Sequence, residues 1–328
     1  MIRQLQVYRS GGFDPYENLA TEQYLLEQDA ADGCILYLWQ NQNTVVIGRN
    51  QNAFKECRVS LLEEEGGHLA RRLSGGGAVF HDLGNLNFTF LVPRADYDVR
   101  RQLEVICSAC RSFGIPAEIS GRNDLTARGQ KFSGNAFYKS GDRAYHHGTL
   151  LMQVDMSKLG RYLSPSKAKL AAKGVESVRA RVVNLCSFVP GLTCDAMCRQ
   201  LVRAAQEIYG LEARELTLSH ADRTAIAALR EHYAGREWRF GANVPASFAC
   251  EGSFSWGNVS LELQVEQGSI ARAALYTDAM EWELSALLKQ ALEGCAFSRA
   301  AMQEALAALP IQPAIREDLS RMLAEQEI

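Results

Sequence analysis

The chain has 328 residues, of which 47% are hydrophobic and 22% charged, and its 35 basic and 38 acidic residues give a net charge of -3. This composition is typical of a globular protein of about two domains, and it excludes a disordered or fibrous chain. It also argues against a general nucleic-acid-binding surface, because binding to the phosphate backbone normally requires a basic surplus.

The first predicted elements are a helix and two strands. The helix runs from Pro15 to about Gln28, with Asp14 as its N-cap. Two apolar strands follow at 35–39 and 44–47, and the turn-forming residues between them predict a hairpin. The residues before the helix lack the apolar core of a signal peptide, and no later apolar run approaches the roughly 20 residues that span a bilayer. We therefore expect a cytoplasmic protein with no membrane segment.

Residues 71–82, with the sequence RRLSGGGAVFHD, combine two cations, three glycines and an apolar strand. Because glycine has no Cβ, backbone N–H groups can converge on phosphate or carboxylate oxygens, and arginine adds permanently charged donors. We interpret this glycine run as an anion-binding loop, although a plain flexible turn has the same local pattern. Strands at 78–80 and 86–92 are predicted to pair around a turn at 82–85, so that the run enters an antiparallel sheet.

Nine cysteines, an odd number spread thinly along the chain, do not resemble a disulfide framework, so we expect reduced thiols. Cys107 and Cys110 have the spacing of half a zinc site or a redox pair. They lie on a predicted amphipathic helix that directs Cys110 toward a core, which favours packing over chemistry. Cys194 and Cys198 begin another amphipathic helix behind the N-cap Thr193, and we expect a packing role there as well.

Residues 121–125, with the sequence GRNDL, place the carboxylate of Asp124 beside the amide of Asn123. This combination is suited to holding Mg²⁺ against a substrate phosphate, and an Asx turn is the alternative. Lys131 then opens a predicted strand at 131–137 among small residues, which leaves room for its ammonium to meet a ligand. A solvated surface lysine would show the same pattern.

His146 and His147 lie on a further predicted strand at 145–154. Neighbours on a strand point to opposite faces, so the two imidazoles make a poor metal pair. Later in the chain, long helices after Thr193 and Asp222 end near residue 240, and the small residues at 241–247 indicate a linker. The remaining predicted elements are strands at 254–265 and 270–276, a turn at 266–269 and a helix at 281–293.

Taken together, these segments resemble the lipoate-protein ligase family from Asp14 to the end of the chain. The most specific segments are 71–82, 121–125, 131–136, 147–151 and 169–185. The resemblance implies an α+β catalytic domain with a mixed or antiparallel sheet, shared with biotin ligases and class II synthetases, at residues 1–241. It also implies the small C-terminal α+β domain of the longer ligases, at residues 248–328.

The resemblance further implies a reaction. Such enzymes activate lipoate with MgATP to lipoyl-AMP, and then pass the lipoyl group to a lysine of an acceptor protein. The acceptors are lipoyl domains of 2-oxoacid dehydrogenase complexes and the glycine-cleavage H protein. We expect a monomer that binds neither nucleic acid nor membranes.

Roles for individual residues are carried over from the matching motifs. Lys131 is expected to contact both the lipoate carboxyl and the α-phosphate, and Asp124, with Asn123 beside it, is the expected Mg²⁺ contact. The residues expected to hold the nucleotide are Arg72, Gly77, Ala78, Val79, Phe80, Asn123, Asp124 and Lys131. The residues expected to line the lipoate pocket are Gly75, Gly76, His81, Lys131, His147 and Gly148.

The basic segment 158–181 is either a solvated face or a docking surface for acidic acceptors, and residues around 173–175 are expected to close over the adenylate.

Three alternative functions stay open. Related octanoyltransferases carry the acyl group on an active-site cysteine, but none of the nine cysteines falls in the glycine run or near Lys131. Biotin ligases have a different basic glycine loop. A non-catalytic lipoyl-carrier binding protein is the third alternative. The preference between lipoate and octanoate does not follow from the sequence.

Overall fold

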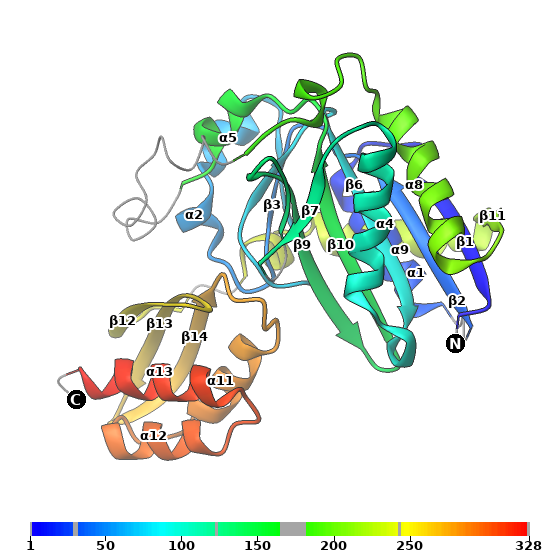
Figure 1. The fold of residues 1–328 in the computed structure, drawn as a ribbon. Coiled ribbons are helices and arrows are strands. Elements are labelled where there is room, and N and C mark those ends of the chain that lie inside the picture. Colours follow the sequence, from blue (N-terminus) through cyan, green and yellow to red (C-terminus); the bar gives the residue numbers. More distant parts are fainter. Residues whose placement is uncertain (1, 29–31, 122–123, 165–181, 242–243, 327–328) are drawn as a thin grey trace.

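The structure is a computed structural model, and it describes residues 2–28, 32–121, 124–164, 182–241 and 244–326. Three predictions lie wholly or mostly outside these residues: the role of Asn123 beside the expected metal contact, the closing loop around 173–175, and the basic segment 158–181, of which only 158–164 are described. The described residues form a larger N-terminal part and a smaller C-terminal part, which lies to one side of it (Figure 1).

The N-terminal part is built on a mixed sheet of eight strands in the order β11-β1-β2-β6-β10-β9-β8-β7. The pairs β1–β11 and β1–β2 are parallel, and the other neighbours are antiparallel. In that order the strands are β11 (Ala213–Glu215), β1 (Gln4–Arg9), β2 (Gly33–Trp39), β6 (Asn85–Pro93), β10 (Arg143–Leu151), β9 (Gln130–Ser140), β8 (Asp124–Ala127) and β7 (Ala117–Ser120). The predicted strands at 131–137 and 145–154 are confirmed, and they pair with each other.

Helices cover both faces of this sheet (Figure 1). On one face, α4 (Val99–Ser112) and α8 (Cys194–Tyr209) pack over the apolar side of β6, where Leu86, Phe88 and Phe90 are fully buried. On the other face lie α1 (Pro15–Glu27) and α9 (His220–Ala234). The intervening residues of β6, Asn87 and Thr89, therefore point to the face that carries α1, because side chains alternate along a strand.

A second, three-stranded sheet stands apart from the large one. It has the order β4-β3-β5, from β4 (His68–Arg71), β3 (Thr44–Ile47) and β5 (Val79–His81). The predicted hairpin of strands 35–39 and 44–47 is therefore wrong, because β2 pairs with β1 and β6 while β3 pairs with β4 and β5. The predicted pairing of 78–80 with 86–92 is wrong for the same reason, although β5 does run antiparallel to its actual partner β3.

The helix starts follow the capping chemistry of the sequence. The Asp14 carboxylate accepts from the backbone N–H groups of Tyr16 and Glu17, and Thr193 Oγ1 accepts from Ala196 N, as predicted. The helix expected after Asp222 begins earlier, because Ser219 and Asp222 form a capping box that places Asp222 inside the first turn. The short helices are α2 (Ala53–Glu56), α3 (Val59–Glu64), η1 (Arg94–Asp96), α5 (Met156–Tyr162), η2 (Leu185–Ser187) and α10 (Arg236–Phe240).

The C-terminal part is a three-stranded antiparallel sheet covered by helices, with a hydrophobic core of its own. The predicted turn at 266–269 joins two of these strands, which pair as expected. The first strand of the sheet was not predicted from the sequence. The elements are β12 (Phe248–Phe254), β13 (Gly257–Glu266), β14 (Ser269–Thr277), α11 (Leu284–Leu292), α12 (Arg299–Ala307) and α13 (Pro313–Ala324).

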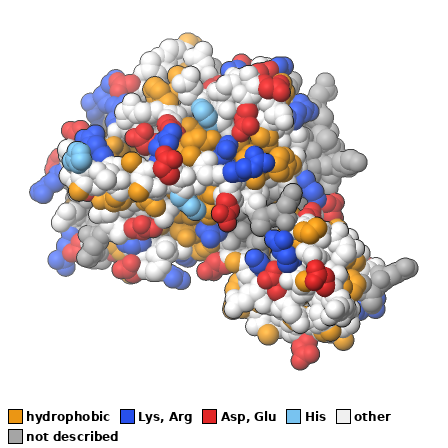
Figure 2. Space-filling view, turned by 180° about the vertical axis from the view of Figure 1, so that it is seen from behind, with side chains coloured by type: hydrophobic (Ala, Val, Ile, Leu, Met, Phe, Trp, Pro, Cys, Tyr) orange, Lys and Arg blue, Asp and Glu red, His pale blue; other side chains and the backbone are white. Residues whose placement is uncertain are grey.

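The surface mixes charges of both signs. Figure 2 shows acidic and basic side chains interspersed over both parts on the face that it presents. Within the described ranges, no helix has the length and apolar character needed to cross a bilayer.

Candidate functional site

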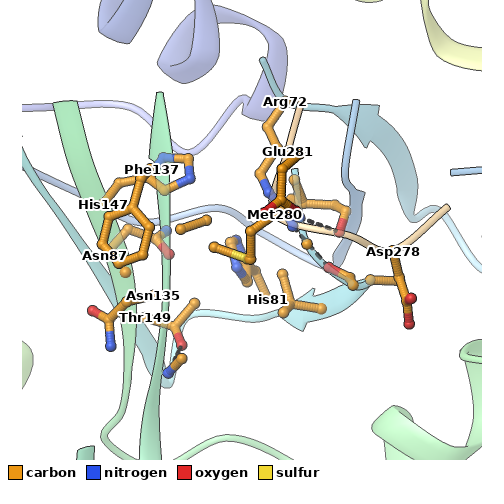
Figure 3. A pocket seen from close by; sticks show the side chains of 18 of the residues that line it. Arg72, His81, Asn87, Asn135, Phe137, His147, Thr149, Asp278, Met280 and Glu281 are labelled. Carbon is orange, nitrogen blue, oxygen red and sulfur yellow. Dashed lines mark hydrogen bonds between the residues drawn. The ribbon is translucent and has the colours of Figure 1, made fainter. Parts of the chain in front are cut away.

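A cavity of about 660 Å³ lies between the large sheet, the glycine run and the C-terminal part. Its floor is formed by β6, β9 and β10, and one wall is formed by the segment from Arg72 to His81. The opposite wall comes from the C-terminal part, mainly from the segment after β14, with further residues from the turn before 257 and from residue 312. Residues far apart in the sequence therefore meet here. In Figure 3, Asp278, Met280 and Glu281 stand across the hollow from Asn87, His147 and Thr149.

The floor is ordered by the strand register. Thr149 on β10 lies opposite Asn87 on β6, and Asn87 lies opposite Trp39 on β2. On the other side of Thr149, its Oγ1 accepts a 3.4 Å hydrogen bond from the backbone N–H of Gly134 on β9. These residues form a floor row that crosses four strands, from Gly134 through Thr149 and Asn87 to Trp39. The row fixes the relative positions of the groups that line the cavity.

Lys131 lies at the β9 end of the floor row. A Cβ placed on Gly134 would lie 3.2 Å from Lys131 Nζ, so the ammonium folds back over this glycine. The same Nζ lies 2.6 Å from Asp124 Oδ1, and both side chains remain more than one-third exposed. In the register of β8 and β9, Asp124 lies opposite Gly134 and Thr126 lies opposite Lys131, with a shift between Leu125 and Thr126. The predicted cation and the predicted metal contact are thus neighbours, and their charged groups are accessible.

The two arginines of the glycine run have different surroundings. Arg71 points away from the cavity, and its guanidinium donates to the carbonyls of Gly48, Arg49, Gln51, Trp238 and Arg239. Arg72 lines the cavity, but it also donates to the carbonyls of Val46, Gly75 and Gly77 and to Ser74 Oγ. Burial lowers the pKa of each guanidinium to about 10, so both remain charged at neutral pH. Arg71 therefore joins the start of the glycine run to the loop at 48–51 and to residues 238–239, whereas Arg72 fixes the backbone conformation of the run through residues 74–77.

A buried polar network joins the run to the floor. The carboxylate of Glu22 on α1 accepts a 2.8 Å hydrogen bond from His147 Nδ1 and a 2.7 Å bond from Thr89 Oγ1. The other imidazole nitrogen of His147 lies 2.8 Å from Ser74 Oγ, which also accepts from Arg72. Glu22 is 1% exposed, so its charge depends on these partners. The network fixes the ring of His147 at the cavity wall.

The C-terminal part docks on the glycine run through its backbone. Gly76 N donates a 2.9 Å hydrogen bond to Ala279 O, and Asn50 Nδ2 donates to the carbonyls of Glu281 and Trp282. A Cβ on Gly75 would lie 2.7 Å from Met280 O, so this glycine is required for close approach. Gly75 is thus an interface residue in this structure, whereas the resemblance placed it at the mouth of the lipoate pocket.

The structure brings most of the predicted site residues to one cavity. The predicted residues that line it are Arg72, Gly76, Gly77, Ala78, Val79, His81, Lys131, His147 and Gly148. Asp124 does not itself line the cavity, but its carboxylate contacts the lining residue Lys131. Asn123 lies outside the described residues. Phe80 is 2% exposed, and its side chain packs in a core against Tyr162, so Phe80 does not line the cavity. Alternation along β5 explains this difference, since Val79 and His81 point inward.

Sequence reasoning missed several residues of the site. Trp39, Asn87 and Thr149 line the cavity, and none of them was singled out. Glu22 supports the cavity from α1 without lining it, and it was also missed, although a carboxylate that interrupts an apolar helix face is a detectable signal. The wall residues of the C-terminal part gave no such signal, because the local sequence does not show that they pack against the glycine run and the large sheet. These wall residues are Ser255, Trp256, Asp278, Met280, Glu281 and Gln312.

No cysteine lines the described cavity, and all nine thiols are free. Burial raises the pKa of Cys34 and Cys57 to about 12 and that of Cys194 to about 11. Cys107 and Cys110 are buried on α4, as predicted. Thiols of this kind are poor nucleophiles at neutral pH, because the thiolate is the reactive form.

Comparison with known proteins identifies the family. Residues 14–206 match the lipoyl protein ligase A/B catalytic domain. The chain belongs to the lipoyl protein ligase family. Residues 244–324 also match the C-terminal domain of bacterial lipoate protein ligases. The predicted α+β fold with a mixed sheet and an added C-terminal domain is thereby confirmed.

Solved structures of lipoate-protein ligases have the same fold. P. falciparum LipL1 in complex with lipoate has a TM-score of 0.86 and 26% identity, over 98% of this chain and 100% of that one. A bipartite ligase of T. acidophilum, from a study that includes its E2 lipoyl domain, has a TM-score of 0.66 and 27% identity, over 76% and 100% of the two chains. Lipoate-protein ligase A bound with ATP has a TM-score of 0.64 and 27% identity, over 74% and 99%.

Proposed function

We propose that this chain activates lipoate with ATP to lipoyl-AMP and transfers the lipoyl group to a lysine of an acceptor protein. One observation carries the proposal. The ammonium of Lys131 enters the cavity beside the Asp124 carboxylate, while the glycine run forms the wall of the same cavity. Membership of the ligase family supports ligation, and relatives solved with lipoate and with ATP support these two substrates.

In the first half-reaction, the lipoate carboxylate attacks the α-phosphorus of ATP. The bond from that phosphorus to the bridging oxygen breaks, and pyrophosphate leaves. Two anions must approach each other, and a fixed ammonium lowers this repulsion without forming a covalent intermediate. Lys131 is placed to do this for both groups. Arg72 and the backbone of Gly77 to Phe80 then hold the nucleotide, with Arg72 acting chiefly by shaping the run.

The residues present fit a magnesium ion of the kind that ATP carries. Mg²⁺ is usually held by one or two carboxylates together with substrate phosphates, so a preformed protein cage is not required. Among the described residues, no group of three or more His, Cys, Asp or Glu side chains is arranged to hold a metal. Asp124 is the carboxylate that would contact the ion, and the ion would neutralise phosphate charge.

In the second half-reaction, the amine of an acceptor lysine attacks the acyl carbonyl. The amine loses a proton, the anhydride bond breaks, and AMP leaves. Lys131 stays beside the acyl group during this step in our proposal. Lipoyl domains of 2-oxoacid dehydrogenase complexes and the glycine-cleavage H protein are the proposed acceptors, and the T. acidophilum study that includes an E2 lipoyl domain supports the former. Because one chain supplies the described walls of the cavity, we propose that the monomer is active.

The cysteine-dependent octanoyltransferase mechanism has less support. It requires a thiolate beside the acyl group, and the described cavity contains no cysteine side chain. Burial also raises the pKa of thiols elsewhere in the chain, that of Cys57 to about 12 and that of Cys194 to about 11.

The test combines two signals, pyrophosphate release and the mass of an apo acceptor domain, with lipoate and MgATP as substrates. We expect Lys131→Ala to lower the rate of pyrophosphate release by about 100- to 1,000-fold, as loss of one fixed charge-stabilising group does. Its urea unfolding should match the wild type, because the side chain is more than one-third exposed. Lys139→Ala, on the same strand but outside the cavity lining, is the matched control. Wild-type rates in Lys131→Ala would refute the assignment.

A further inference from the structure

Two buried polar groups in the cavity have no hydrogen-bond partner among the described residues. They are His81 Nε2 and Asn87 Nδ2, which we call the donor pair. His81 is 3% exposed and Asn87 is 1% exposed, and both residues line the cavity. Buried polar groups are nearly always paired, because an unmet donor costs the free energy of its lost hydration. Two such groups in one cavity therefore point to a ligand that pairs with them.

Hydrogen bonds on the far side of His81 determine which nitrogen carries its proton. Asn18 Nδ2 donates a 2.8 Å bond to Gln40 O, a carbonyl that can only accept, and a 3.0 Å bond to Asn41 Oδ1. The amide of Asn41 therefore presents its Nδ2 to His81 Nδ1, at 3.2 Å. Burial lowers the pKa of His81 to about 3, so its ring is neutral at pH 7. The remaining proton is on Nε2, which makes this atom a donor.

Asn87 supplies the second donor. Its Oδ1 accepts a 2.9 Å hydrogen bond from Asn85 Nδ2, which leaves its own Nδ2 directed away from Asn85. Trp39 connects the two donor residues, because it lies opposite Asn87 in the sheet and its ring meets the His81 ring edge-on, with centroids 6.3 Å apart. The donor pair therefore lies at the Trp39 end of the floor row. Figure 3 shows His81 below Met280, in the middle of the hollow.

The opposite end of the floor row carries Lys131. Asn87 on β6 and Gly134 on β9 are separated by β10, so these two residues are about 10 Å apart, at two strand spacings. Charged ligand groups belong at the Lys131 end, where the ammonium stabilises them. The donor pair is uncharged, so it suits an uncharged acceptor at the other end of the same ligand.

We propose that the donor pair recognises the ring sulfurs of lipoate and makes the enzyme prefer lipoate to octanoate. This inference rests on the proposed function. A lipoate whose carboxylate lies at Lys131 extends its dithiolane ring along the floor row toward Asn87 and His81. Octanoate ends in a methyl group there and leaves both donors unpaired, which a site built to donate hydrogen bonds disfavours. Because sulfur is a weak acceptor, the preference is moderate.

The test measures kcat/KM for lipoate and for octanoate by pyrophosphate release. Asn87→Leu keeps the approximate shape of the side chain and removes the donor. We expect the ratio of the lipoate to the octanoate value to fall about 5- to 30-fold, the effect of losing one hydrogen bond of moderate strength. His81→Phe should shift the ratio in the same direction. Thr149→Val, a neighbour whose hydroxyl oxygen accepts from Gly134 N, should change both rates together and keep the ratio.

The outcomes separate the two proposals. If the wild type releases no pyrophosphate with either acid, the proposed function fails. If the wild type is active and Asn87→Leu and His81→Phe both fold yet keep the wild-type ratio, the donor pair does not select the acid. If either substitution raises the KM of ATP equally with both acids, the donor pair serves the adenine base, and the inference is overturned.

Discussion

Glu22 is a carboxylate on the buried side of α1, between the apolar residues Leu19 and Leu26 on the same helix face. A buried charge is tolerated only when it is paired and hydrogen-bonded. Glu22 meets this condition through His147 and Thr89, one on each of two neighbouring strands. It therefore sets the orientation of His147 without facing the cavity itself. This is a positioning role, since Glu22 touches no proposed substrate group.

Replacing Glu22 by Ala should destabilise the protein by about 1–3 kcal/mol, because His147 Nδ1–H and the Thr89 hydroxyl each lose a buried acceptor. The measurement is urea unfolding. Glu64→Ala, on the exposed side of α3, is the control and should change stability by less than about 0.5 kcal/mol. The KM for lipoate should also rise, because the ring of His147 loses its fixed position. Unchanged stability and unchanged KM in Glu22→Ala would contradict the role given to this network.

At the scale of elements, the glycine run is held against the loop that follows β3. Ser74 O accepts a 2.9 Å hydrogen bond from Arg49 N, and Ile47 O accepts a 3.0 Å bond from Arg72 N. A Cβ on Gly48 would overlap Gly76 O, whereas a Cβ on Gly77 would meet no atom within 4 Å. Two glycines close in space thus have different reasons to lack a side chain. Gly48 permits the packing of the run, and Gly77 keeps the cavity open.

Alanine substitutions should separate these two reasons. Gly48→Ala should lower the free energy of unfolding by about 1–3 kcal/mol, because the added methyl displaces the backbone of the run. Gly77→Ala should unfold like the wild type, yet raise the KM of ATP by about 10-fold or more, since its methyl occupies space proposed for the nucleotide. Thermal unfolding and initial-rate kinetics give the two values. Equal stability losses in both variants would show that the run is packed uniformly.

Much of the secondary structure could be predicted from the sequence, whereas the partners of the strands could not. Residues 40–43 have hairpin chemistry, but Asn41 is fully buried and bonds Asn18 and His81, so the turn leads into another sheet. Pairing between distant segments leaves no local signal. The same limit applies to the site: Lys131 and the glycine run have distinctive patterns, whereas Met280 and Asn87 enter the cavity only because of non-local packing.

At the scale of the whole molecule, the N-terminal and C-terminal parts differ in their titratable groups. All six histidines of the sequence precede residue 233, so the C-terminal part contains none. His81, His146 and His147 are buried, and burial lowers the pKa of His81 and of His146 to about 3. The parts meet through backbone contacts such as Gly76 to Ala279, and each has its own core. Acid should therefore act on them unequally.

The sign of this effect follows from proton binding. Between pH 6.5, the usual pKa of an unfolded histidine, and about pH 3, the unfolded chain binds a proton at His146 that the folded chain does not, so stability falls as the pH falls. From pH 7 to pH 5 this amounts to about 2 kcal/mol for one histidine. Urea unfolding of His146→Gln should therefore show a pH dependence smaller by about that amount than the wild type. His220→Gln, at an exposed position, should keep the wild-type dependence.

Hydrogen exchange tests whether acid acts on the two parts unequally. On lowering the pH from 7 to 5, and after correction for intrinsic rates, amide protection should fall more in β6 and β10 than in β13 and β14. Equal losses in both parts would show that they unfold as one unit.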